Sequence, residues 1–174
     1  SGKTTVTHLL RAVFEAAGRP CGVIGTLSGA RTTPEATDLQ QLLAAERRAG
    51  RRAVAVEVSS HGLALHRVDA TRFAVAAFTN LSQDHLDFHG TMDEYFAAKA
   101  RLFAEPFTRR AVICVDDRWG ERLAAQVAGR PDVDVVTYSL DDARDLELRP
   151  GGAAFRWRGA EVSLRLTGRF NAAN

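Results

Sequence analysis

Hydrophobic and polar positions follow two different periods along the chain, and they predict helices and strands in turn. Apolar residues spaced three and four apart are typical of amphipathic helices, which we expect over residues 7–18, 38–50, 91–104 and 119–129. Short, nearly continuous apolar runs are typical of buried strands, which we expect from residue 53 onward and over 21–26, 74–80, 111–117 and 134–139. This alternation predicts an α/β fold, with a mostly parallel sheet flanked by helices.

Local signals place the ends of several elements. Thr33 is expected to cap the second helix, with Pro34 at its first position. Thr91 and Glu94 have the spacing of a capping box, which would start the helix that carries Lys99. After residue 145 polar and apolar residues alternate between glycine-containing turns, and this pattern predicts an antiparallel β segment near the C-terminus.

Composition narrows the class of protein. The 174 residues are 45% hydrophobic and 25% charged, which is typical of one globular domain with a sizeable core. The formal net charge is only +2 and no arginine pair extends into a basic run, so nucleic acid is not a favoured partner. Cys21 and Cys114 lie in apolar runs, and we expect them to be buried thiols in the reducing cytoplasm. No apolar stretch approaches the length of a bilayer span, so no membrane partner is expected.

Two short motifs indicate nucleotide chemistry. The chain opens with SGKTT, in which Gly2, Lys3 and Thr4 match the end of a P-loop, where lysine reaches phosphates and a hydroxyl binds Mg²⁺. Glu57 follows an apolar strand, and in an open parallel sheet ligands bind at this end of the strands. A carboxylate there is a common second support for a nucleotide-bound Mg²⁺.

A third polar cluster follows the strand that ends near Asn80 and includes Asp84, His85, Asp87 and His89. It is compatible with a solvated loop or, through its histidines, with a zinc site. The helical H-E-x-x-H frame is missing, which disfavours zinc. Lys99 taken alone has the pattern of a surface lysine over apolar neighbours. The residues by themselves thus predict a Mg-nucleotide domain and leave its reaction open.

Three longer stretches behind SGKTT resemble the Mur ligases: EVSSHGLALHRVD, FTNLSQDHLDFHGTMDEYFAAKARLF and GRFNAAN. Within that family they are most similar to the enzymes that add the third residue of the peptidoglycan peptide. The resemblance implies an ATP- and Mg²⁺-dependent amide ligase that acts on UDP-MurNAc-L-Ala-D-Glu and a diamino acid, expected to be meso-diaminopimelate. In this family ATP phosphorylates the peptide carboxylate, and the incoming amine then displaces phosphate from the acyl phosphate.

The resemblance also implies roles for individual residues. Lys3, Lys99 and His85 correspond to catalytic positions, Lys99 to a lysine carbamylated by CO₂. Thr4 and Glu57 correspond to ligands of one Mg²⁺, and His85 and carbamylated Lys99 to ligands of a second. The nucleotide-binding positions correspond to Gly2, Lys3, Thr4, Thr5, Asn80, Asn171 and Asn174. The positions that hold the UDP-MurNAc-dipeptide correspond to Thr32, Thr33, Ser59 and Arg67.

The same resemblance predicts a domain organisation. Residues 1–174 would be the central ATP-binding domain, incomplete at both ends, without the N-terminal UDP-binding and C-terminal amino-acid-binding domains. The glycine-rich front of the P-loop is missing, so we expect these residues alone to be inactive. We expect the protein to be a monomer. The alternatives are another ligase of the superfamily, such as a folylpolyglutamate synthase, a P-loop switch that hydrolyses nucleotide without ligation, and a regulatory homologue that binds without turnover.

Overall fold

The computed structural model describes residues 2–29, 31–82 and 86–174 of the chain. These residues form two compact units. We call residues 3–29, 31–74 and 86–108 the N unit, and Gly2 with residues 75–82 and 109–174 the C unit. The predicted nucleotide-binding and metal-binding residues are therefore divided between two units, each of which is described by itself.

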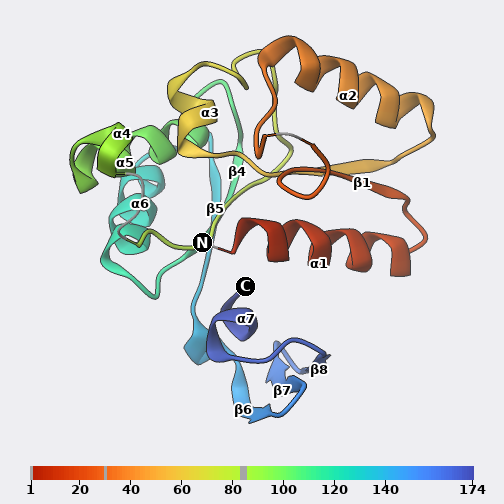
Figure 1. Ribbon diagram of the computed structural model, residues 1–174. Helices are drawn as coiled ribbons and strands as arrows, with labels where there is room; N and C mark the ends of the chain where they lie inside the picture. Colours follow the sequence, from red (N-terminus) through yellow and green to blue (C-terminus); the bar gives the residue numbers. More distant parts are fainter. Residues whose placement is uncertain (1, 30, 83–85) are drawn as a thin grey trace. The chain divides into compact units, whose positions relative to one another are not determined.

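The N unit is built on two parallel strands between helices (Figure 1). Strand β1 pairs with β2 in a register that places Cys21 opposite Ala53. Helix α1 packs against both strands, and α2 lies on the other side of them. The elements in chain order are α1 (Lys3–Ala16), β1 (Cys21–Ile24), α2 (Ala36–Arg48), β2 (Ala53–Val56), α3 (Ser60–Ala64), α4 (Leu86–His89), α5 (Met92–Ala100) and the 3-10 helix η1 (Arg101–Phe103).

The main core of the N unit lies beneath α2 and α3. Ile24 of β1, Leu39 of α2 and Leu63 of α3 are buried together with Val68 and Phe107. Partly buried side chains of β2 pack against this cluster, so the sheet and two helices share one apolar layer. The polar residues that follow β1 and β2 continue directly from these two strands. Burial of the apolar surface of the strands therefore also fixes where those polar residues begin.

The start of α2 differs from the prediction. The helix begins at Ala36 with Glu35 at the N-cap position, so the expectation that Thr33 caps it and Pro34 opens it is wrong. The Thr33 hydroxyl is instead buried and donates to the backbone carbonyl of Glu57, 2.9 Å away. The local pattern predicted that the Thr33 hydroxyl would cap α2, but this hydroxyl forms a tertiary hydrogen bond instead.

The start of α5 agrees with the prediction. Thr91 Oγ1 accepts from the backbone N–H of Glu94, and the Glu94 carboxylate accepts from the backbone N–H of Thr91, which completes the capping box. Lys99 lies in the last turn of this helix, as expected.

The C unit contains a parallel and an antiparallel sheet. In the first sheet β4 lies between β3 and β5, and both pairings are parallel. In the second, β7 lies between β6 and β8, and both pairings are antiparallel, which confirms the predicted change of pattern after residue 145. The elements are β3 (Ala76–Phe78), β4 (Arg110–Cys114), α6 (Arg118–Ala128), β5 (Asp134–Tyr138), the 3-10 helix η2 (Leu140–Asp142), β6 (Arg144–Arg149), β7 (Gly152–Trp157), β8 (Ala160–Leu164) and α7 (Arg169–Ala173).

Both cysteines are buried free thiols, as predicted. Cys21 is 1% exposed and Cys114 is 3% exposed. Burial raises the pKa of Cys114 to about 11, so this thiol stays protonated at neutral pH. A buried, protonated thiol is a poor nucleophile, and neither cysteine is a candidate for chemistry.

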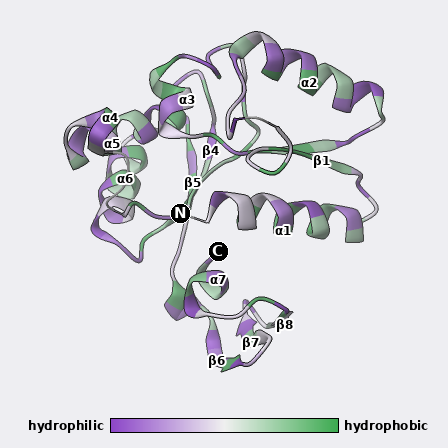
Figure 2. Ribbon diagram, viewed as in Figure 1, coloured by the Kyte–Doolittle hydropathy of each residue, from purple (hydrophilic) through white to green (hydrophobic). Residues whose placement is uncertain are grey.

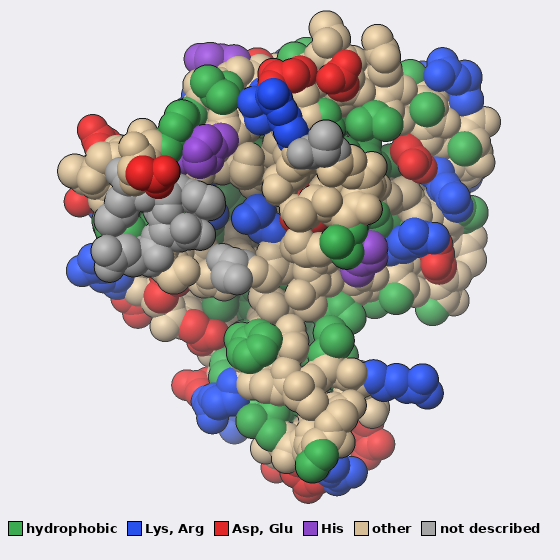
Figure 3. Space-filling model, viewed as in Figure 1, with side chains coloured by type: hydrophobic (Ala, Val, Ile, Leu, Met, Phe, Trp, Pro, Cys, Tyr) green, Lys and Arg blue, Asp and Glu red, His purple; other side chains and the backbone are tan. Residues whose placement is uncertain are grey.

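The surface follows from the same amphipathic patterns. Figure 2 shows helices such as α2 striped in hydrophilic and hydrophobic colours. On the face shown in Figure 3, Lys and Arg side chains are interspersed with Asp and Glu. Among the helices of the described residues, none combines the length and apolarity that crossing a membrane would require.

Close packing of α6 on β4 generates a stability prediction. A Cβ added at Gly120 would lie 1.8 Å from the backbone carbonyl oxygen of Cys114. The Gly120→Ala substitution must therefore push the helix away from the strand, and we expect it to lower the free energy of unfolding by about 1–3 kcal/mol. Thermal or denaturant unfolding measures this loss.

Gly129 provides the matched control at the other end of α6. Its φ of −70° suits any residue, and the nearest atom to an added Cβ is 3.8 Å away. Gly129→Ala should be neutral or slightly stabilising. Equal stability of the two variants would show that the helix and strand are not in close contact at Gly120.

Candidate functional site

A buried carboxylate lies at the end of β2, beside the first turn of α1. Glu57 is 2% exposed, and its backbone N–H donates to Ile24, which continues the pairing of β1 with β2 by one residue. Thr4 Oγ1 donates to Glu57 Oε2 over 2.9 Å. The structure therefore brings together Thr4 and Glu57, two residues that the sequence placed at one metal site.

The spacing of these two oxygens fits a magnesium ion. Mg²⁺ takes oxygen ligands at 2.0–2.1 Å in octahedral geometry, so two neighbouring ligands are about 2.9 Å apart. Thr4 Oγ1 and Glu57 Oε2 have this separation. Both are hard oxygen donors of the kind that Mg²⁺ prefers.

Lys3, Thr4 and Thr5 form the first turn of α1, a helix of 14 residues. The first N–H groups of a helix have no intrahelical acceptor and favour negative charge. Gly2 precedes this turn with a φ of +85°, a conformation that side chains disfavour. The turn can therefore bind an anion such as phosphate.

Sequence reasoning missed Thr26, which completes the surroundings of Glu57. The Thr26 N–H donates to Glu57 Oε1 over 3.1 Å, and its hydroxyl donates to Glu57 Oε2 over 3.2 Å. Thr32 Oγ1 lies 3.0 Å from Thr26 Oγ1 and extends the row of hydroxyls. Thr26 follows β1 as Glu57 follows β2, so the strand-end rule that identified Glu57 would have found it.

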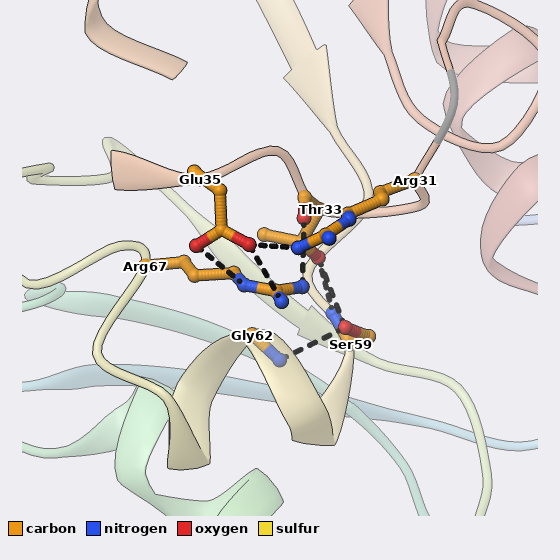
Figure 4. Close-up of polar contacts among 6 residues, drawn as sticks. All are labelled: Arg31, Thr33, Glu35, Ser59, Gly62 and Arg67. Atoms are coloured by element: carbon orange, nitrogen blue, oxygen red, sulfur yellow. Dashed lines mark hydrogen bonds and ion pairs between the residues drawn. The ribbon is translucent and has the colours of Figure 1, made fainter. Parts of the chain in front are cut away.

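Thr33 and Ser59 join the loop before α2 to the segment between β2 and α3 (Figure 4). Besides donating to the Glu57 carbonyl, Thr33 Oγ1 accepts from the Ser59 N–H over 2.9 Å and lies 3.1 Å from Ser59 Oγ. Ser59 Oγ in turn caps α3 by accepting from the Gly62 N–H. A Cβ at Gly62 would lie 2.7 Å from the Thr33 side chain, so this close contact requires glycine. The two hydroxyls thus fix the loop before α2 against the start of α3.

Arg67 is held by the same loop. Its Nε donates to Glu35 Oε2 over 3.2 Å, and its Nη2 lies 2.8 Å from Glu35 Oε1, which makes a bidentate ion pair (Figure 4). Its Nη1 donates to the Thr33 carbonyl over 3.2 Å. Arg31 also binds the Glu35 carboxylate. Sequence reasoning identified Arg67 but missed Glu35, for which the sequence carries no signal beyond its place behind Pro34.

Lys99 belongs to the N unit as well. Its Nζ lies 5.2 Å from the centre of the Tyr95 ring, one turn earlier on α5. The Tyr95 ring stacks on His89 at 4.9 Å, and His89 Nε2 lies 2.8 Å from Ser60 Oγ at the start of α3. His89 is therefore a buried tie between two helices, and the helix of Lys99 is anchored to the segment that carries Ser59.

The remaining predicted nucleotide residues belong to the C unit. Asn174 packs against Gly2, where an added Cβ would lie 2.1 Å from Asn174 Oδ1. The side chain of Asn171 donates to the Thr167 carbonyl over 2.7 Å and so fixes the start of α7. Asn80 is half-buried, two residues beyond β3. His85 lies outside the described residues, and within the described part no three His, Cys, Asp or Glu side chains are grouped as metal ligands.

Comparisons with known proteins agree with this fold. The family model of the Mur ligase middle domain matches residues 1–174. A Pseudomonas aeruginosa protein named UDP-N-acetylmuramoyl-L-alanyl-D-glutamate--2,6-diaminopimelate ligase is 45% identical over 193 aligned residues, which cover 100% of this chain and 39% of that protein. A Corynebacterium glutamicum protein of the same name is 45% identical over 194 residues, which cover 100% of this chain and 37% of that protein.

A solved structure gives the same result. It is titled as the structure of a UDP-N-acetylmuramoyl-L-alanyl-D-glutamate--2,6-diaminopimelate ligase, and it superposes with a TM-score of 0.87 at 32% identity. The match covers 99% of this chain and 39% of that one. The chain thus spans about two fifths of the length of the relatives it matches. Because the family model matches the entire length of this chain, the chain belongs to the Mur ligase family, in which it corresponds to the middle domain.

Proposed function

We propose that this chain is the ATP-binding middle domain of a ligase that joins 2,6-diaminopimelate, as the third peptide residue, to UDP-MurNAc-L-Ala-D-Glu. The names of relatives that align with all of this chain support the reaction. The observation that carries the proposal is the contact of Thr4 with Glu57 in the same unit as the Thr33, Ser59 and Arg67 network. The N unit thus contains both the side chains that would hold a nucleotide-bound metal ion and those that would bind a substrate carboxylate.

The first turn of α1 would hold the phosphates of ATP. Lys3 supplies a positive charge there, and the free N–H groups of the turn favour the phosphate oxygens. Thr4 and Glu57 would hold Mg²⁺, which would neutralise charge on the phosphate that is transferred. We assign Gly2, Thr5, Asn80, Asn171 and Asn174 to the nucleotide as well, with Asn171 next to the adenine.

The carboxylate of the peptide substrate would bind at Arg67. A planar guanidinium pairs with carboxylates through parallel N–H groups, and this geometry orients the substrate as well as attracting it. Thr32 and Ser59 would contact the same substrate. Thr33 is 1% exposed and its hydroxyl already has three internal partners, so it would support the site by positioning Ser59 and Arg67.

Lys99 and His85 complete the proposed site. We propose that Lys99 carries a carboxylate after reaction with CO₂ and that His85 shares a second metal with it. The anchoring of α5 to α3 through His89 and Ser60 supports a defined position for Lys99. The domains for the uridine nucleotide and the amino acid would lie outside this chain, in a monomeric cytoplasmic enzyme.

The reaction is tested by amine-dependent phosphate release. The complete protein that contains this chain is incubated with ATP, Mg²⁺ and UDP-MurNAc-L-Ala-D-Glu, with meso-diaminopimelate, L-lysine or no amine. We expect phosphate release that depends on meso-diaminopimelate, because phosphate leaves the acyl phosphate when the amine attacks it. Equal release in all three reactions would indicate an ATPase and would reject the ligase.

The metal role of Glu57 is tested by Glu57→Gln. The amide keeps the shape of the side chain but replaces one oxygen with a donor, so we expect kcat to fall by at least about a hundredfold. The concentration of Mg²⁺ needed for half-maximal activity should rise.

Glu15→Gln is the matched control for that substitution. Glu15 is an exposed carboxylate that pairs with Arg11 one turn earlier on α1, and its loss should leave kcat and the Mg²⁺ requirement unchanged. A Glu57→Gln protein that folds normally and keeps the Mg²⁺ dependence of the unaltered protein would exclude Glu57 as a ligand.

A further inference from the structure

Arg67 is unusually constrained for an arginine that follows a short helix. Its side chain is only 12% exposed, and three of its N–H groups have acceptors within the loop 33–35. A guanidinium has five N–H donors, so two remain for a ligand. The Nε and Nη2 edge faces Glu35, and a ligand carboxylate must approach from elsewhere on the group.

Glu35 occupies a helix N-cap position but does not cap the helix. Its backbone is extended, with φ of −61° and ψ of 156°, and its side chain accepts no hydrogen bond from α2. The residues that cap helices from this position are Ser, Thr, Asp and Asn, and glutamate is not one of them. Here the carboxylate points to Arg67 and Arg31 instead (Figure 4). The start of α2 fixes the backbone of Glu35, while its side chain binds Arg67.

We propose that Glu35 is a positioning residue for Arg67, which it holds in the orientation that receives the carboxylate of the peptide substrate. The inference rests on the proposed function, in which Arg67 binds that carboxylate. Glu35 fixes one edge of the guanidinium and the Thr33 carbonyl fixes Nη1, so the long side chain is ordered before the substrate arrives. Ordering a side chain beforehand removes part of the entropic cost of binding.

The local charge favours this role over competition with the substrate. Arg31 and Arg67 contribute two positive charges and Glu35 one negative charge, which leaves a formal sum of +1 to attract an anion. Arg31 also shares the Glu35 carboxylate, so Glu35 is not left as a bare anion beside the incoming carboxylate. Glu35 therefore orients Arg67 without cancelling the attraction of the cluster.

The test is Glu35→Gln in the complete protein. The amide has the same length but has lost the charge and one of the two acceptors, so Arg67 should become mobile. We expect the KM for UDP-MurNAc-L-Ala-D-Glu to rise by about five- to tenfold. The values of kcat and of the KM for ATP should stay within about twofold, since a uniform loss of binding raises KM alone.

Two further variants separate positioning from other roles. Glu15→Gln removes a carboxylate of similar exposure that pairs with Arg11 on α1 and has no part in this cluster, so it should leave all three constants unchanged. In an Arg67→Ala background, Glu35→Gln should cause no additional rise in the KM for the dipeptide substrate, because a residue that acts through Arg67 has nothing left to position.

The outcomes are distinct. A lower KM in Glu35→Gln would show that Glu35 competes with the substrate, and an unchanged KM would show that it has no part in binding. A rise that persists in the Arg67→Ala background, or that extends to ATP, would indicate a structural role for Glu35. Each of these results overturns the inference alone. Absence of ligation in the unaltered protein would overturn the proposed function, and the inference with it.

Discussion

The hydrogen bond from the Thr33 hydroxyl to the Glu57 carbonyl is the contact on which the polar site of the N unit depends. It joins the loop before α2 to the end of β2, and the same oxygen accepts from Ser59 at the start of α3. Without the Thr33 hydroxyl, the buried Glu57 carbonyl and the half-buried Ser59 N–H would lose this partner, which costs up to about 1–3 kcal/mol for a fully buried group. The loop before α2 and the segment 57–59 would then be free to move independently, and Thr32, Glu57 and Ser59 of the proposed site lie on them.

The Glu57 side chain imposes a second constraint, because a buried carboxylate must be compensated. Thr4 and Thr26 supply the donors, one from the first turn of α1 and the other from the end of β1. The carboxylate thus ties the first turn of α1 to the sheet. A side chain with this structural role is also suited to hold a metal ion, since replacing hydroxyl donors by a cation would keep its oxygens satisfied.

The sequence allowed the elements and the strand-end positions to be predicted, because both depend on local periodicity and on the rule that parallel strands end at one edge. The position of Glu57 directly after a strand is confirmed, and so is the position of Lys99 on a helix, which the Thr91–Glu94 capping box predicted. The cap of α2 was misplaced because a local rule cannot weigh a tertiary bond, and Thr33 bonds to a residue 24 positions away. The pairing of Glu35 with Arg67 spans 32 positions and has no local pattern at all. The division of the strands into separate parallel sheets was equally invisible to periodicity, which reports burial and not strand order.

Arginine at position 67 has a physical explanation in this arrangement. A lysine ammonium is a point charge with three donors and could not pair with Glu35 through two parallel bonds while also binding the Thr33 carbonyl. The flat guanidinium has donors on separate edges, so three N–H groups can bind the protein while two stay available to a ligand. The loop that supplies both acceptors is itself fixed to Glu57 through Thr33. Thr33 therefore connects Arg67 to the strand end that carries Glu57, and a carboxylate bound at Arg67 would be held in a constant relation to Glu57.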